Sequence, residues 1–232
     1  MRSNPTTQST VPRRSGFSLV ELLTVIAIIS VLMTVAGVGL GNLAGGKGVA
    51  TAVSTSEAVF EEARSLAVGK RTNAAVLVSL QDPSNPETYL RRMVVAYKEI
   101  DPVTNKQDNT WKLASRGATL PDKVYYSTDL SMRDHKTGSG GLPKITLSTG
   151  KREYSGEYVI YEFNAEGICT TPGASFVVGT GTRTPGGSER RPKVIAAAKM
   201  DFGGFVIWRN GNTSIFRDPR QITKGKNNII HF

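Results

Sequence analysis

The fold of this chain is decided near its N-terminus, by a stretch that runs Arg13-Arg14-Ser15-Gly16-Phe17-Ser18-Leu19-Val20-Glu21-Leu22-Leu23 and continues into an apolar segment. Residues 22–46 are 25 consecutive residues without a charge. A helix of that length spans about 37 Å at 1.5 Å per residue, which exceeds the roughly 30 Å hydrocarbon core of a bilayer. The stretch therefore predicts a long helix whose first half, about residues 17–44, spans a membrane.

Two simpler interpretations explain this segment less well. A secretory signal peptide begins with basic residues, as here at Arg2, Arg13 and Arg14, but its apolar region is only about 7 to 15 residues long. An ordinary membrane anchor does not account for Glu21, because an ionised carboxylate at membrane depth costs about 2.5 to 3.5 kcal/mol. Glu21 is therefore a candidate functional residue that needs a positively charged partner.

Residues 14–23 closely resemble the class III signal of type IV prepilins and type II secretion pseudopilins. The resemblance implies that a membrane-embedded prepilin peptidase cuts between Gly16 and Phe17, and then methylates the new amine of Phe17. It also implies that Glu21 pairs with the N-terminal amine of a neighbouring subunit during filament assembly. The buried charge would then be compensated between chains, which supplies the missing partner.

The resemblance and the charge pattern together predict three parts of the chain. Residues 1–16 are a cleaved leader, residues 17–70 form a pilin helix, and residues 71–232 form a periplasmic β-rich domain. The basic residues before the apolar segment keep that end of the chain cytoplasmic. We therefore expect a single-pass protein of the bacterial inner membrane that later enters a pilus or pseudopilus.

The helical period returns after a glycine-rich segment at residues 37–48. Between residues 49 and 70, one apolar or small stripe recurs in steps of three and four residues, at Val49, Val53, Ser56, Phe60, Ala63 and Ala67. The stripe predicts an amphipathic second half of the helix that packs on a sheet. Gly69 is predicted to cap the C-terminus of this helix.

Beyond residue 71 the pattern is that of β-strands, many of them alternating apolar and polar residues. The predicted strands are residues 74–80, 90–99, 123–127, 144–148, 157–163, 174–178, 193–199, 204–209 and 214–217. One helix followed by many strands predicts an α+β fold. We expect a pilin-like arrangement, with the long N-terminal helix packed on an antiparallel β-rich domain.

Two short patterns narrow the resemblance. Residues 62–67, which lead into a strand, and residues 163–167, which follow one, resemble the GspH/FimT-type minor pilins. The resemblance implies a structural subunit without enzyme activity or a cofactor, whose partners are the prepilin peptidase, other pilin or pseudopilin subunits and the inner membrane.

The remaining residues offer no catalytic or metal-binding constellation. His135 and His231 belong to no helical metal motif, and Cys169 has no obvious histidine partner. Cys169 is the single cysteine, so we expect a small buried side chain, with pairing to another chain as the alternative. Asp and Asn residues between positions 101 and 109 do not match the spacing of an EF-hand loop, which favours a solvated hairpin turn.

The formal net charge of +10 is placed unevenly along the chain. Residues 17–179 contain sixteen basic and sixteen acidic residues, whereas residues 180–232 contain ten basic and three acidic ones. Nucleic-acid or partner contact is considered for eight of these basic residues: Arg183, Arg190, Arg191, Lys193, Arg217, Arg220, Lys224 and Lys226. The absence of a base-reading motif favours a solvated surface or a patch matched to an acidic neighbour. The nearby Phe205, Trp208 and Phe216 are predicted core residues.

These observations favour a minor pseudopilin of a type II secretion pseudopilus. The alternative is a minor pilin of a type IV or competence pilus, which binds DNA through its basic C-terminal region. A third interpretation, from a different class, is a membrane-anchored binding protein that is never cut.

Overall fold

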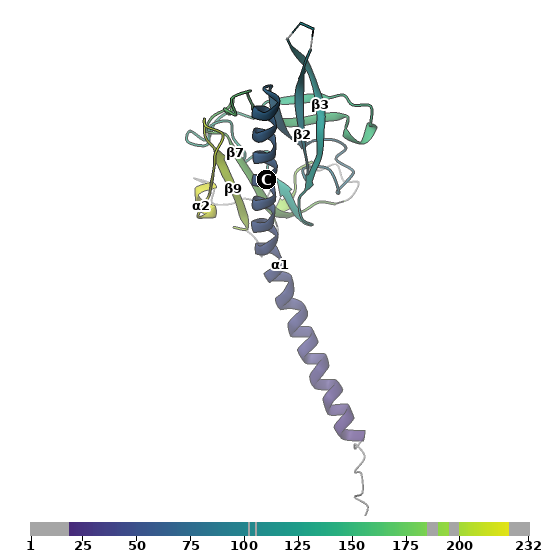
Figure 1. Cartoon of the computed structure of the whole chain (residues 1–232). Coiled ribbons are helices and arrows are strands. Elements are labelled where there is room, and N and C mark those ends of the chain that lie inside the picture. The colour runs from purple at the N-terminus through teal and green to yellow at the C-terminus, as the bar shows by residue number, and fades with distance from the viewer. Residues whose placement is uncertain (1–18, 102, 105, 185–189, 195–199, 223–232) are drawn as a thin grey trace, which may run out of the picture. The chain divides into compact units, whose positions relative to one another are not determined.

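The computed structural model describes residues 19–101, 103–104, 106–184, 190–194 and 200–222, and of residues 31–47 only the backbone. The described chain has the predicted α+β order of one long helix followed by strands (Figure 1). The first helix is α1 (Leu19–Lys70), and it continues through the glycine-rich segment. The chain divides into two compact units between Gly41 and Asn42, within that segment, and the second unit contains the β-rich domain.

Within the described residues, ten strands and two short helices follow α1. They are β1 (Ala74–Ser79), β2 (Arg92–Ile100), β3 (Gln107–Thr119), β4 (Val124–Tyr126), β5 (Lys144–Leu147), η1 (Arg152–Tyr154), β6 (Gly156–Phe163), β7 (Ser175–Thr182), β8 (Lys193–Val194), β9 (Phe202–Ile207), β10 (Thr213–Ile215) and α2 (Pro219–Ile222). Each of the nine predicted ranges contains a strand. Residues 195–199 of one predicted range lie outside the described residues.

The long strand β3 was not predicted, and its burial explains why. All but four of its thirteen residues are exposed and none is fully buried, because it forms the edge of its sheet. The sequence of β3 therefore lacks the alternation of apolar and polar residues by which a half-buried strand is recognised.

The membrane-spanning half of α1 is not confirmed. Among the residues whose side chains are described, the structure contains no helix that combines the length and the apolar character of a membrane crossing.

The amphipathic half of α1 is confirmed. Every member of the predicted stripe from Val49 to Ala67 is at most 5% exposed, and Ala52 and Val59 extend it. Ser56 remains compatible with this burial because its hydroxyl donates to the Ala52 carbonyl at 2.7 Å. The predicted cap at Gly69 is wrong: Arg71 takes the left-handed conformation, and the amides of Arg71 and Thr72 donate to the carbonyls of Val68 and Ala67.

The strands form two antiparallel sheets. The first has the order β3-β2-β1-β6-β5, and the second has the order β10-β9-β7-β4, with β8 paired to β7. The central strand β1 pairs with β2 on one side and with β6 on the other. Its residue Ala74 lies opposite Tyr97 of β2 and opposite Phe163 of β6. Within the second unit, α1 runs with β2 and β3 on one side and β7 and β9 on the other (Figure 1).

One aromatic side chain of α1 joins the helix to both sheets. The Phe60 ring lies 5.0 Å from Tyr161 and 6.3 Å from Phe163, both on β6. It also lies 5.4 Å from Phe176 on β7 and 5.1 Å from Phe205 on β9. All four contacts are edge-to-face, the arrangement that the ring quadrupole favours. Phe60 is therefore the centre of the main core.

A buried hydrogen-bond chain also links the two sheets. The Tyr161 hydroxyl donates to the Ser175 carbonyl at 2.9 Å, which leaves the Tyr126 hydroxyl to donate to Tyr161 at 2.8 Å. Burial raises the pKa of Tyr126 to about 12 and raises that of Tyr161 well above its ordinary value. Both tyrosines thus stay neutral and keep this polar link inside the core.

A second apolar cluster covers the opposite face of the first sheet. Ala75 and Leu77 of β1 point away from the main core, as the alternation of a strand requires, and pack with Tyr158 and Ile160 of β6. Tyr154 of η1 completes this cluster. Both faces of β1 are therefore buried, which explains why its sequence is apolar without alternation from Ala74 to Val78.

The pairing of β2 with β3 is irregular. The pairing shifts register between Met93 and Val95 and again between Lys98 and Ile100. Gly117 lies at φ +60°, and a Cβ there would be 2.0 Å from the Met93 carbonyl oxygen. A larger residue therefore does not fit at this bulge.

The position of Phe60 predicts a large loss of stability on truncation. Phe60→Ala is expected to lower the free energy of unfolding by about 3 to 5 kcal/mol, because it removes the contacts to both sheets and leaves a cavity. Glu62→Ala, at an exposed position of the same helix, is the matched control and is expected to change it by less than about 0.5 kcal/mol. Denaturant unfolding followed by circular dichroism measures both, and equal effects would contradict the central role of Phe60.

Candidate functional site

The predicted processing and assembly residues lie at the start of α1. Gly16 and Phe17 fall outside the described residues. Glu21 lies in the first turn of the helix, where the positive end of the helix dipole stabilises a carboxylate. The Thr24 hydroxyl, one turn later, donates to the carbonyls of Val20 and Glu21 at 3.0 and 2.9 Å. Within the described residues, no ion pair involves Glu21.

The helix surface around Glu21 is apolar and exposed on all sides. Leu19 is 77% exposed, and the seven other large apolar residues of this segment, up to Ile29, are between 46% and 68% exposed. A helix that is apolar all round is stable only inside an apolar environment or packed against other chains. The carboxylate of Glu21 is thus presented on a surface that requires a partner.

The structure separates the predicted basic residues of the C-terminal region into different roles. Lys224 and Lys226 lie outside the described residues. Arg183 follows β7, and its guanidinium lies 4.3 Å from the centre of the Tyr89 ring and donates to the Pro83 carbonyl at 2.7 Å. Arg183 is therefore used to hold the loop of residues 82–91 in place.

The other described basic residues of this set are exposed. Arg191 forms an ion pair with Asp129 at 3.1 Å, and Lys193 begins β8, opposite Thr182 in the register. Arg217 and Arg220 lie beside and within α2. The described members of the set thus lie after β7, at or just before β8, and beside or within α2, and Arg183 and Arg191 are among those with partners within the domain.

Three sequence predictions about nearby side chains have mixed outcomes. Phe205 is fully buried and Cys169 is 2% exposed, so both are core residues as predicted. Burial raises the pKa of the Cys169 thiol. The prediction for Trp208 is wrong, because it follows β9 with half of its surface exposed and its indole donates to the Ser214 hydroxyl at 2.7 Å.

The acidic turn between β2 and β3 behaves as a hairpin turn. The Asp101 carboxylate accepts hydrogen bonds from the amides of Val103 and Thr104 and from the Thr104 hydroxyl. The bond from the Val103 amide is the main reason that the pKa of Asp101 is lowered. Its carboxylate is therefore used within the turn, and Asn105 lies outside the described residues.

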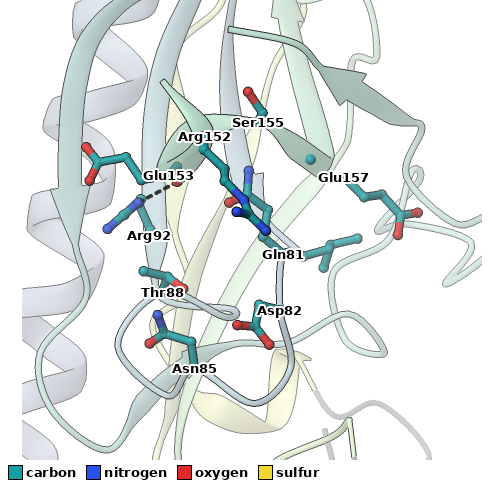
Figure 2. A pocket seen from close by; sticks show the side chains of 11 residues that line it. Gln81, Asp82, Asn85, Thr88, Arg92, Arg152, Glu153, Ser155 and Glu157 are labelled. Carbon is teal, nitrogen blue, oxygen red and sulfur yellow. Dashed lines mark hydrogen bonds between the residues drawn. The ribbon is translucent and has the colours of Figure 1, made fainter. Parts of the chain in front are cut away.

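A polar pocket of about 710 Å³ lies on the β-rich domain, and no sequence signal pointed to it. Its walls come from two segments that are distant in the chain, residues 80–92 and residues 152–157. Figure 2 shows amide, hydroxyl and guanidinium groups gathered there, from Gln81, Asn85, Thr88, Arg92 and Arg152. The hydrogen bond from the Leu80 amide to the Glu157 carbonyl, at 2.9 Å, holds the two segments together.

Comparison with known families identifies the N-terminal segment. Residues 11–37 match the prokaryotic N-terminal methylation motif. This match covers Gly16, Phe17 and Glu21 and supports a type IV prepilin-like protein that is processed by prepilin peptidase. No curated protein and no solved structure matches the chain.

The contacts of Arg183 predict a structural role for this residue. Arg183→Ala is expected to lower the free energy of unfolding by about 2 kcal/mol, because it removes the stacking on Tyr89 and a charged hydrogen bond to Pro83. The exposed Arg220→Ala is the control and is expected to cost less than about 0.5 kcal/mol. Denaturant titrations measure the free energy of unfolding of both variants. An equal decrease in the two variants would rule out the structural role of Arg183.

Proposed function

We propose that this chain is a minor pseudopilin of the GspH/FimT type, a structural and non-catalytic subunit of a type II secretion pseudopilus. The observation that carries the proposal is the methylation motif at residues 11–37, which includes the exposed apolar residues from Leu19 to Ile29 at the start of α1. In this proposal, prepilin peptidase cuts after Gly16, and the apolar start of α1 lies in the inner membrane before assembly.

The geometry around Glu21 supports assembly through α1. The carboxylate has no ion-pair partner among the described residues, and apolar side chains surround it. Bringing such a helix into a filament core requires a cation beside Glu21, because an unpaired buried charge is strongly unfavourable. The methylated amine of Phe17 of a neighbouring subunit is that cation in our proposal.

The division of α1 supports a subunit with two separate tasks. The side chains of the stripe from Val49 to Ala67 are buried against the two sheets. In contrast, the helix from Leu19 to Ile29 buries none of its large apolar side chains. The second half of α1 therefore belongs to the folded domain. The first half remains available for the membrane and then for other subunits.

A DNA-binding subunit of a type IV or competence pilus ranks second. The exposed Arg190, Arg217 and Arg220 suit contacts to phosphates. However, Arg183 and Arg191 already have partners within the domain, which reduces the charge available to an external ligand. A surface matched to an acidic neighbour in the filament accounts equally well for the three exposed residues.

Processing is tested by the mass of the chain recovered from membranes that contain prepilin peptidase. We expect a polypeptide that begins at Phe17 and bears one added methyl group. A variant with Gly16→Leu is the control and is expected to remain uncut. Recovery of the intact wild-type chain, beginning at Met1, would reject the proposed function in favour of an uncut membrane-anchored protein.

Assembly is tested separately by Glu21→Ala. We expect cleavage to continue and incorporation into filaments to be lost, because the amine of Phe17 no longer has a counter-charge in the apolar core. Thr24→Val, one turn further along the same helix, removes only local hydroxyl bonds and is expected to assemble. Co-purification with sheared filaments measures both variants, and normal incorporation of Glu21→Ala would contradict charge pairing.

A further inference from the structure

The polar pocket of Figure 2 has positively charged groups on its inner wall. The guanidinium of Arg92 is held in place, since it donates to the Glu153 carbonyl at 2.9 Å and lies 5.1 Å from the centre of the Tyr154 ring. Arg152 extends from η1 toward Gln81 in the close view. Among the described residues, no carboxylate pairs with either arginine.

Three carboxylates also line the pocket, and two of them already have partners. Glu157 forms an ion pair with Lys144 at 3.2 Å, on the side away from Arg152. Asp82 accepts hydrogen bonds from the hydroxyl and the amide of Ser84, which lower its pKa and keep it ionised. The Glu153 side chain points away from the other lining side chains. The pocket is thus lined by two guanidinium groups that have no carboxylate partner among the described residues, whereas the carboxylates of Asp82 and Glu157 already interact with Ser84 and Lys144.

Two further groups in the pocket are suited to polypeptide recognition. The Asn85 side chain uses its carbonyl oxygen to accept from the Glu87 amide, which leaves its NH2 group to donate to a ligand. The Gln81 amide donates to the Tyr158 hydroxyl at 2.8 Å, which fixes its orientation and leaves its carbonyl oxygen as an acceptor. Guanidinium groups together with an amide donor and an amide acceptor in one pocket match a carboxylate together with a peptide group.

We propose that this pocket binds one aspartate or glutamate side chain from an extended segment of a partner protein, in which basic or neutral residues flank that acid. Arg152 and Arg92 bind the carboxylate, and Asn85 and Gln81 contact the adjoining backbone. The role of this pocket does not depend on how the chain is processed or assembled.

The arrangement of charges selects this ligand over other anions. Asp82, Glu153 and Glu157 repel a polyanion such as nucleic acid or an acidic polysaccharide, but they attract cations that flank a single acid. Among the described residues that line the pocket, none is an aromatic residue on which a sugar ring would stack. An isolated carboxylate between basic side chains is therefore the best electrostatic match.

The proposal is tested with a fluorescent peptide that contains one Lys-Glu-Lys unit between Gly and Ser residues. Binding to the full-length protein in detergent is followed by fluorescence anisotropy at low salt. Arg152→Gln is expected to weaken binding at least tenfold, and Arg92→Gln by a similar factor. Lys151→Gln removes a neighbouring exposed charge that does not line the pocket, and it is expected to change the affinity by less than twofold.

Control ligands separate this proposal from general electrostatic attraction. A peptide with Gln in place of Glu is expected to bind at least tenfold more weakly, and poly-glutamate and an oligouronate are expected to bind more weakly than the Lys-Glu-Lys peptide. Absence of binding by the wild-type protein would overturn the proposal. Equal loss with Lys151→Gln, or tighter binding of either polyanion, would overturn it as well. Circular dichroism of each variant shows that the fold is retained.

Discussion

The packing of Phe60 between two sheets is the interaction on which the rest of the structure depends. Phe60 of α1 contacts rings from β6 of the first sheet and from β7 and β9 of the second sheet at once. The hydrogen bonds from Tyr126 to Tyr161 and from Tyr161 to Ser175 reinforce the same junction. A single helix thus organises two sheets into one domain.

This constraint divides α1 between two physical environments. Residues from Val49 to Ala67 bury their apolar stripe in the domain, and the segment from Leu19 to Ile29 leaves its apolar surface exposed. The methylation motif occupies the exposed end. In the proposed function, this helix connects the folded domain to a filament, and the β-rich domain presents a surface at the other end.

The β-rich domain also explains why the basic residues of the C-terminal region do not act as one group. Arg183 stacks on Tyr89 and fixes a loop that forms one wall of the polar pocket, whereas Arg191 pairs with Asp129. Charge that is counted along a sequence is therefore not equivalent to charge on a surface. The pocket itself combines Arg92 and Arg152, which are distant in the chain, and no pattern in the sequence indicated that they line the same pocket.

The sequence by itself determined the features that depend on local chemistry and period. These are the processing motif with Glu21, the buried stripe of α1 and the approximate positions of nine strands, because each leaves a repeating or dense pattern among neighbouring residues. Only the tertiary structure decided the exposed strand β3, the cap at Arg71, the exposure of Trp208 and the walls of the polar pocket. Each of these depends on which distant segments become neighbours, and the order of residues along the chain does not encode that directly.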